Sequence, residues 1–466
     1  MLKFFRINDP FRVIYIALLL LVFRLPFWLS ENRLTVAELS WLTLAEKLNS
    51  GAVMYADIWD KTPLLAAWCY QISELLFGKT IIPLHFIALI LILHQAYVFN
   101  KFLIDFNILN EKTYVPAYLY VVFINFSFDN LIFSPALCSL SFLILVLRNI
   151  LRPEHKTVEQ DIFKSGFYLG IATLFYFPSI SFAILTLIGY IFFRTSSLKT
   201  LLNILYGFST IIISFFTYLY YYDILDNFFT LFWYEISPNT WITKSEISWL
   251  LAISVFWGLA GLFASVYESN KFINYQNRCR QFMVLWAITA ILNLLFIQQL
   301  QPNDAIFLVP SLAFLTTNLL LLIRKFLLAE VLSWVVTFSV LLVNYNTLHG
   351  YFKDWDKVDY SKMLVQTRQF PFQNKKVLVL GDTKDYYLNN QLATPYFQWE
   401  FASKHFQSLD NYSILIEIQK NFEKDFPEII VDEKKIVQHL FKKIPAIASY
   451  YQQDKTNPII YRKKDI

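Results

Sequence analysis

Long apolar runs separated by short charged loops make up the first three quarters of the chain. A membrane-spanning helix needs about 20 mainly apolar residues to cross a hydrocarbon core of about 30 Å. We predict eleven such helices, at 10–29, 81–99, 114–128, 131–149, 166–178, 179–194, 200–222, 247–267, 282–300, 305–323 and 326–347. The run 63–77 is shorter and more polar, so it is expected to lie against the membrane surface. The pattern therefore predicts a polytopic α-helical membrane domain over residues 1–349.

Residues 350–466 follow a different pattern. Short apolar runs at 376–382, 427–432 and 457–462 predict β-strands. The stretches near 383–391, 434–443 and 445–453 predict helices between and after them. This alternation indicates a small α/β domain with a largely parallel sheet. Of the 75 charged residues, 33 lie in the 116 residues from Tyr351 onward, so this quarter has the composition of a water-exposed domain.

The distribution of Lys and Arg predicts the orientation of the chain. Cytoplasmic loops of membrane proteins carry an excess of these residues. The N-terminus carries Lys3, Arg6 and Arg12, and further Lys and Arg residues lie in the alternate loops 100–113, 150–165, 194–199, 268–281 and 324–325. The run from Val13 to Leu29 ends without a small-residue cleavage motif, which is typical of a retained signal anchor. We therefore predict a multi-pass protein of the plasma membrane (the bacterial inner membrane), with a cytoplasmic N-terminus and an extracytoplasmic domain at 350–466.

Composition and spacing exclude several classes of function. The net charge of +5 comes without a dense Lys/Arg cluster, so no nucleic-acid partner is expected. The three cysteines show no paired spacing, and the six histidines form no HExxH motif, so no metal site is expected. Gly381 alone cannot form a dinucleotide-binding fingerprint, which needs three glycines in register. No cofactor is therefore predicted.

The loop between the first two predicted spans, residues 30–80, is long for a chain whose other connections are short. Apolar residues from Val36 to Leu48 recur at helical spacing, which predicts an amphipathic helix on the membrane, and Gly51 is expected to end it. The stretch from Tyr55 to Pro63 then mixes acids, aromatic residues and Lys61. Long loops of this kind tend to be functional.

The order of residues in this loop resembles that of the GT-C membrane glycosyltransferases, in the branch of the protein O-mannosyltransferases and the bacterial aminoarabinose lipid A transferases. The matching positions are Ala37-Glu38, Trp41, Gly51, Tyr55-Ala56-Asp57, Thr62-Pro63-Leu64, Phe77-Gly78-Lys79-Thr80 and His85. The chain departs from the family pattern at three of them. Ala37 stands where the family has its usual catalytic Asp, Thr62 replaces a Pro, and His85 replaces an Arg. Outside this loop the resemblance is mainly one of topology.

The resemblance implies transfer of a sugar from a polyprenyl-phosphate donor to a lipid, glycan or protein acceptor at the outer face of the membrane. In such chemistry a carboxylate activates the acceptor hydroxyl, and cationic or hydrogen-bonding groups stabilise the leaving phosphate. With Ala37 at the family's Asp position, the candidate catalytic residues are Glu38 and Asp57. Candidate substrate-binding residues are Tyr55, Asp60, Lys61, His85, Asp129 and Asn303.

Each candidate also has a structural interpretation. Glu38 fits the solvated face of an amphipathic helix, Asp57 fits a turn cap, and Tyr55 fits an aromatic anchor at the membrane interface. Two other functions stay open: a transporter that flips a lipid-linked sugar, and a non-enzymatic membrane assembly factor. Transporters often show repeated halves, and no internal repeat is visible here. Convergence of Glu38, Asp57 and His85 on one outward-facing cavity would favour the enzyme.

Overall fold

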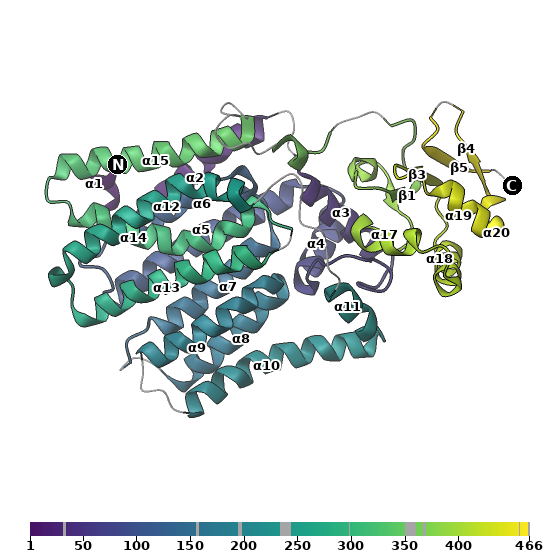
Figure 1. Cartoon of the computed structure of the whole chain (residues 1–466). Coiled ribbons are helices and arrows are strands. Elements are labelled where there is room, and N and C mark those ends of the chain that lie inside the picture. The colour runs from purple at the N-terminus through teal and green to yellow at the C-terminus, as the bar shows by residue number, and fades with distance from the viewer. Residues whose placement is uncertain are drawn as a thin grey trace. The chain divides into compact units, whose positions relative to one another are not determined.

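The computed structural model describes residues 1–30, 34–154, 158–193, 198–233, 244–297, 299–349, 360–366, 370–455 and 457–464. The chain divides into two compact units (Figure 1). We name the first the helical unit: it comprises Met1–Glu31, Ile82–Ser214 and Pro238–Tyr360. We name the second the mixed unit: it comprises Asn32–Ile81, Phe215–Ser237 and Ser361–Ile466. The loop 30–80 thus groups largely with the C-terminal residues, although the apolar pattern alone assigns it to the membrane domain.

A helix lies in each of the eleven predicted spans. These helices are α2 (Arg12–Leu29), α5 (Ile82–Asp105), α6 (Val115–Ile124), α7 (Pro135–Ile150), α8 (Glu159–Phe175), α9 (Phe182–Phe193), α10 (Leu198–Tyr221), α12 (Lys244–Tyr267), α13 (Asn274–Phe296), α14 (Val309–Leu322) and α15 (Phe326–His349). The short helix α1 (Leu2–Phe5) precedes them, and short 3₁₀ turns lie between some of them: η1 (Phe128–Leu131), η3 (Phe177–Ser181), η4 (Ser269–Lys271) and η5 (Pro302–Leu308).

Seven of these segments are long and apolar enough to cross a membrane among the residues that the structure describes. They are Arg12–Leu29, Ile82–Asp105, Leu198–Tyr221, Ser245–Tyr267, Asn274–Phe296, Pro302–Leu322 and Phe326–His349. The prediction of a multi-pass α-helical membrane protein is confirmed. Helices such as α6 and α7 are shorter than a full crossing, so the number of eleven crossings stays a prediction.

Helix α14 lies in the interior of the helical unit. The apolar window of Pro302–Leu322 is 83% buried, while no other candidate span exceeds 44%. Helix α12 packs closely against it at Gly261, where an added Cβ would lie 2.1 Å from the Leu315 carbonyl oxygen. Small residues at such crossings let two helix backbones approach each other in a membrane. The glycine therefore fixes the separation of these two helices.

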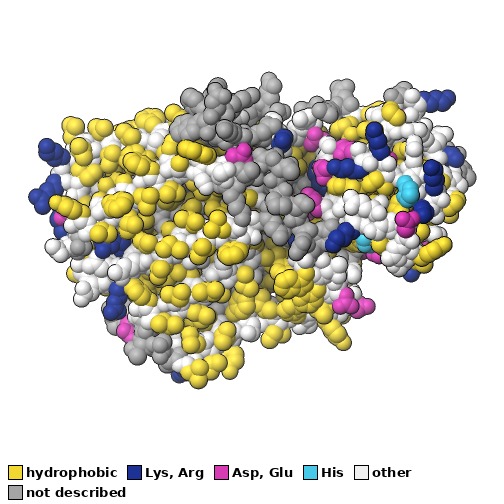
Figure 2. All heavy atoms as spheres, in the orientation of Figure 1, with side chains coloured by type: hydrophobic (Ala, Val, Ile, Leu, Met, Phe, Trp, Pro, Cys, Tyr) yellow, Lys and Arg dark blue, Asp and Glu magenta, His cyan; other side chains and the backbone are white. Residues whose placement is uncertain are grey.

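The surface of the helical unit is largely apolar. Figure 2 shows hydrophobic side chains spread over its helices, with Lys and Arg side chains at one end. Exposed side chains include those of Val22, Ile90, Phe263 and Phe338, which lie on four different helices. Water would not favour so many exposed apolar side chains, whereas lipid tails would. This surface is that of a membrane domain.

The mixed unit contains a five-stranded sheet and several helices. Its helices are α3 (Val36–Asn49), α4 (Leu64–Phe77), α11 (Leu225–Phe232), α17 (Trp399–Gln407), α18 (Tyr412–Lys424), α19 (Val437–Lys443) and α20 (Pro445–Ala448), with the short turns η6 (Tyr360–Met363) and η7 (Asp385–Tyr387) nearby in the chain. Its strands are β1 (Lys376–Leu380), β2 (Gln391–Leu392), β3 (Ile429–Asp432), β4 (Tyr451–Gln453) and β5 (Ile460–Lys463). The strand order is β2-β1-β3-β5-β4.

The three predicted strands are confirmed as β1, β3 and β5, but the sheet is mixed rather than largely parallel. Strand β1 pairs in parallel with β2 and β3, whereas β5 pairs antiparallel with β3 and β4. The helix predicted at 445–453 is partly wrong, because α20 ends at Ala448 and Tyr451–Gln453 forms strand β4. The buried Tyr451 ring explains the change, since it packs in the core beside Phe426.

In the loop 30–80, α3 begins and ends close to where the sequence predicts. It covers Val36–Asn49, and Gly51 follows with a φ of 92°. A left-handed backbone of this kind favours glycine, which is why the helix stops there. Trp41 of α3 stacks on Tyr70 of α4, with ring centroids 5.0 Å apart. The loop is therefore an ordered pair of packed helices.

We expect reporter fusions to confirm the predicted orientation. A fusion at the C-terminus should be active only on the extracytoplasmic side, and a fusion in loop 268–281 only on the cytoplasmic side. The physical reason is the excess of Lys and Arg in the loops assigned to the cytoplasm. A C-terminal reporter that is active only in the cytoplasm would show that the number of crossings is even and the eleven-span prediction wrong.

Candidate functional site

Glu38 lies at the start of α3 and is 1% exposed, so it does not lie on a solvated face as the sequence pattern allowed. Its Oε2 accepts hydrogen bonds from the backbone N–H and the hydroxyl of Thr35, at 3.0 and 2.9 Å. The Glu38 N–H donates in return to the Thr35 hydroxyl, at 3.1 Å. These bonds form a capping box, which satisfies backbone donors at the first turn of a helix. The carboxylate thus has a structural role, whatever its part in catalysis.

A pair of substitutions should separate the capping role of Glu38 from any catalytic role. Glu38→Ala removes the capping box and is expected to destabilise α3 by about 1 kcal/mol. Glu38→Gln keeps an acceptor of the same shape, so the helix should keep its stability. Hydrogen exchange of the α3 amides measures the stability of the helix in both variants. If the Gln variant keeps its exchange protection but loses sugar transfer, the carboxylate itself takes part in the reaction.

Tyr55 and Asp57 lie in the turn that follows α3. Tyr55 has a φ of 68°, is 1% exposed, and donates its hydroxyl to the Thr62 carbonyl at 3.1 Å. Its ring meets Phe228 edge to face, with centroids 5.3 Å apart. The Asp57 carboxylate accepts from the Val53 N–H at 3.0 Å and pairs with Lys424. Its side chain is 20% exposed, so a substrate hydroxyl can reach it.

Asp60 and Lys61 continue the same turn and contact residues far along the chain. Asp60 is 4% exposed and accepts from the Thr62 N–H and the Gln398 side-chain amide, both at 2.6 Å. Burial lowers the pKa of the half-buried Lys61 ammonium, which lies 5.6 Å from the centre of the Phe401 ring. Asp60 thus contacts a polar side chain of the C-terminal segment, and Lys61 lies beside an aromatic ring of the same segment.

A buried lysine, Lys384, lies near Asp60. It is 8% exposed and donates to the Phe397 carbonyl, above the ring of that residue. Burial lowers the pKa of Lys384, and the nearby carboxylates of Glu400 and Asp60 act in the opposite direction. We call Asp60, Lys61, Lys384 and Gln398 the polar cluster of the mixed unit, because Gln398 donates to Asp60, Lys384 lies near Asp60, and Lys61 follows Asp60 in the chain. The cluster thus places the Lys384 cation beside the carboxylates of Asp60 and Glu400, which partly balance its charge.

In the helical unit, the structure brings together Asp129 and Asn303, which are 174 residues apart in the sequence. The Asn303 N–H donates to the Asp129 carboxylate at 2.8 Å, and the Ser127 hydroxyl donates to the same group. Burial raises the pKa of Asp129 to about 6, although these hydrogen bonds act in the opposite direction. A carboxyl group with such a pKa is a typical mark of a functional position.

His85 lies at the start of α5 and is 6% exposed. Its backbone carbonyl accepts from Arg24 of α2 at 2.7 Å, and the other end of that guanidinium donates to the Leu131 carbonyl at 2.6 Å. Arg24 is fully buried. A charged residue inside an apolar span costs about 2.5–3.5 kcal/mol on insertion scales, which by itself marks a position of interest.

Sequence reasoning missed Arg24, Lys384 and Gln398. An arginine in the otherwise apolar run 13–29 is a readable signal, whereas nothing in the sequence links residues 384 and 398 to Asp60. Asp57, Asp60 and Lys61 all belong to the mixed unit, and the structure joins Asp129 and Asn303 within the helical unit. Because His85 and Glu38 belong to different units, their convergence on one cavity stays a prediction. Within the described residues, no three His, Cys, Asp or Glu side chains come together as metal ligands.

Comparison with known families gives one match. The sequence matches DUF6427, described as a family of unknown function, over residues 66–352. The match covers more than half of the chain. The chain belongs to DUF6427. The matched range contains His85, Asp129 and Asn303, while Glu38 and the Tyr55–Lys61 turn precede it. No curated protein matches the sequence significantly.

Solved structures give further matches, of which two are crystal structures of ArnT from Cupriavidus metallidurans. One is bound to undecaprenyl phosphate: it has 13% sequence identity and a TM-score of 0.48, and the match covers 67% of this chain and 60% of that one. The other is in the apo state, with 14% identity, a TM-score of 0.48, and coverage of 66% and 59%. This DUF6427 chain thus spans about three fifths of the length of the ArnT chains that it matches.

Proposed function

We propose that this DUF6427 protein is a membrane glycosyltransferase of the GT-C type. It moves a sugar from a polyprenyl-phosphate donor to a lipid, glycan or protein acceptor at the outer face of the membrane. The reaction is carried by the turn after α3 and by the polar cluster of the mixed unit.

The observation that carries this proposal is the strained backbone of the Tyr55–Asp57 turn. Tyr55 adopts a φ of 68° although it has a bulky side chain, and it is buried in that conformation. Strain of this kind costs about 1–3 kcal/mol and is retained mainly at active sites and ligand clamps. The turn also carries the Tyr-x-Asp spacing that resembles the GT-C pattern. The strain supports a functional role for the carboxylate that the turn presents.

Within this proposal, Asp57 is the base. Its carboxylate is partly exposed, while that of Glu38 is held in the capping box. The acceptor hydroxyl gives its proton to Asp57 as its oxygen forms a bond to the anomeric carbon of the sugar. The bond between that carbon and the phosphate oxygen breaks, and polyprenyl phosphate leaves as an anion. Positioned proton transfer of this kind contributes about 10²–10⁴-fold to a rate.

The leaving phosphate needs a positive partner, and the polar cluster offers two. Lys61 is half-buried beside the Phe401 ring, where a charge interacts more strongly with an anion than it does in water. Lys384 is buried more deeply, above the Phe397 ring and near the carboxylates of Asp60 and Glu400. A charge placed where the leaving group develops its own stabilises the transition state. The same pair of lysines can hold the donor phosphate before transfer.

A comparison of native cells with cells that lack the gene tests the proposal. Without the protein, the lipid-linked sugar donor should accumulate and one glycosylated envelope component should disappear, as measured by mass spectrometry of membrane extracts. Return of the wild-type gene should restore the product, whereas the Asp57→Asn gene should not. If cells without the gene still make the product, and their lipid-linked sugar only lies in a different leaflet from that in native cells, the protein is a flippase and the proposal is wrong.

A further inference from the structure

The helical unit contains a polar cavity of about 250 Å³. It lies between the residue that follows α1, the loop after α5, the loop between α12 and α13, and the end of α14. All of these loops belong to the set that the Lys and Arg pattern assigns to the cytoplasm. The volume is several times the roughly 30 Å³ that one water molecule occupies in the liquid, so a polar group larger than a water molecule fits.

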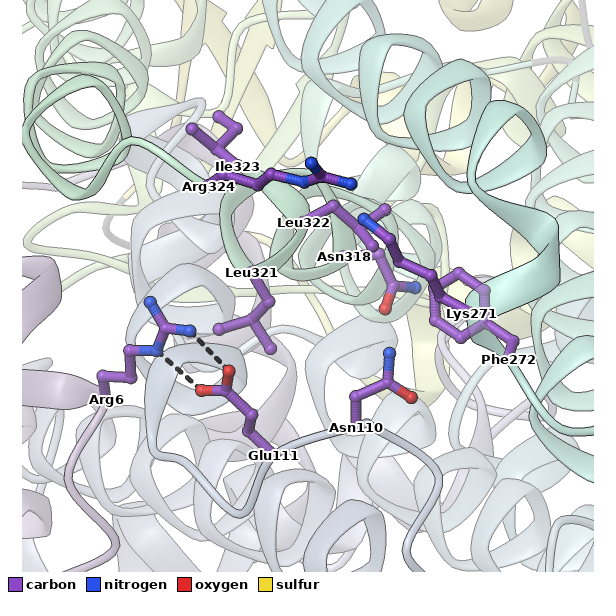
Figure 3. Close-up of a pocket in the computed structure, with 10 residues that line it drawn as sticks. All are labelled: Arg6, Asn110, Glu111, Lys271, Phe272, Asn318, Leu321, Leu322, Ile323 and Arg324. Atoms are coloured by element: carbon purple, nitrogen blue, oxygen red, sulfur yellow. Dashed lines mark hydrogen bonds and ion pairs between the residues drawn. The ribbon is translucent and has the colours of Figure 1, made fainter.

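Three cations and one acid line this cavity: Arg6, Lys271, Arg324 and Glu111. The acid is already engaged, because the Arg6 guanidinium holds Glu111 through two hydrogen bonds, one of them 2.6 Å long (Figure 3). Lys271 also pairs with Glu268 at 2.9 Å. For Arg324, no acid among the described residues lies within ion-pair distance. The lining therefore keeps a positive charge that its own carboxylate does not neutralise.

The side chains of Arg324 and Lys271 extend toward each other across the cavity in Figure 3. Two like charges that face one cavity repel each other, and an anion bound between them would be attracted to both and would offset that repulsion. The amide of Asn318 also lines the cavity although the residue is only 4% exposed. An amide N–H₂ supplies two further donors for an oxyanion.

We propose that this cavity binds a phosphate group, carried by an anionic membrane lipid or by free phosphate. The guanidinium of Arg324 matches the geometry of phosphate oxygens, and Lys271 adds a point charge. Basic pockets between membrane helices on the cytoplasmic side are known to bind phospholipid headgroups. Leu321, Leu322 and Phe272 give the same cavity an apolar wall, which suits a ligand that continues into a lipid tail.

The test uses the purified full-length protein in detergent and measures binding by native mass spectrometry. Phosphatidylglycerol is compared with phosphatidylcholine of the same acyl chains, and inorganic phosphate is titrated separately by thermal shift. Phosphatidylglycerol should bind more tightly than phosphatidylcholine. Arg324→Gln and Lys271→Gln should each weaken that binding about five-fold, the usual effect of one basic residue near an anionic lipid.

Lys325→Gln is the matched control, because it removes one charge from the same loop but does not line the cavity. It should bind phosphatidylglycerol as the wild type does. If inorganic phosphate alone stabilises the protein with the same dependence on Arg324, the phosphate site is supported and its source is free phosphate. If both lipids bind equally, and neither they nor phosphate depend on Arg324 or Lys271, the inference is overturned. None of these outcomes depends on the proposed transferase activity.

Discussion

Asp57→Asn is expected to lower sugar transfer by about 10²-fold or more. The substitution leaves an oxygen that can still accept from the Val53 N–H, so the turn should keep its shape. The ion pair with the exposed Lys424 is lost, and such surface pairs contribute only about 0–1 kcal/mol to stability. What disappears is the carboxylate that takes the acceptor proton, which is worth about 10²–10⁴-fold in rate.

Two controls make this result specific. Lys424→Gln removes the same ion pair but keeps the Asp57 carboxylate, so transfer should stay within a few-fold of the wild type. Asp410→Asn makes the same chemical change at another ion-paired aspartate of the mixed unit, the partner of Lys443. It should have no effect on transfer. Equal losses in all three variants would indicate a general effect of surface charge and contradict the role of Asp57.

Tyr55→Ala is expected to destabilise the turn after α3 by about 3–5 kcal/mol, as large aromatic truncations in a core do. The ring is buried against Phe228, and its hydroxyl bonds to the Thr62 carbonyl. Hydrogen exchange of the amides between Val53 and Thr62 measures the effect, because it reports the free energy of local opening. Sugar transfer should fall as well, since the turn that presents Asp57 opens.

Tyr55→Gly provides an unusual comparison with Tyr55→Ala. Glycine normally destabilises a fold more than alanine because it has more freedom in the unfolded chain. At a φ of 68° the order should reverse, because any Cβ in the left-handed region costs about 1–2 kcal/mol. The Gly variant should therefore be less destabilised than the Ala variant by about 1 kcal/mol. If the Ala variant proves the more stable, the backbone at Tyr55 is not strained and the main support for the proposed site is lost.

The sequence predicts the helices well because each needs only its own local pattern. The apolar runs place all eleven helices, and the Val36 start and the Gly51 stop of α3 follow from helix periodicity and glycine. The spacing Thr35-x-x-Glu38 is itself the signal of a capping box, so the structural role of Glu38 can also be predicted. The mixed sheet cannot, because pairing of β5 with β3 and β4 depends on contacts between distant residues.

In the candidate site, too, local features can be predicted from the sequence and contacts between distant residues cannot. The turn from Tyr55 to Lys61 can be found from its order of residues, which is a local feature. Its partners Gln398 and Lys424 cannot, since more than 300 residues separate them from Asp60 and Asp57. Arg24 could be predicted only in part. Its charge stands out in an apolar run of the sequence, but only the structure shows the two carbonyl groups to which it donates.

Conversion of a lipid-linked sugar by the purified protein tests the central claim most directly. The wild-type protein is incubated with a panel of polyprenyl-phosphate sugars and a lipid extract of its native membrane, and donor loss is followed by mass spectrometry. The account predicts that one donor is converted to free polyprenyl phosphate while the same sugar mass appears on an acceptor, and that Asp57→Asn slows this at least about 10²-fold. If folded wild-type protein leaves every donor intact, the account is contradicted.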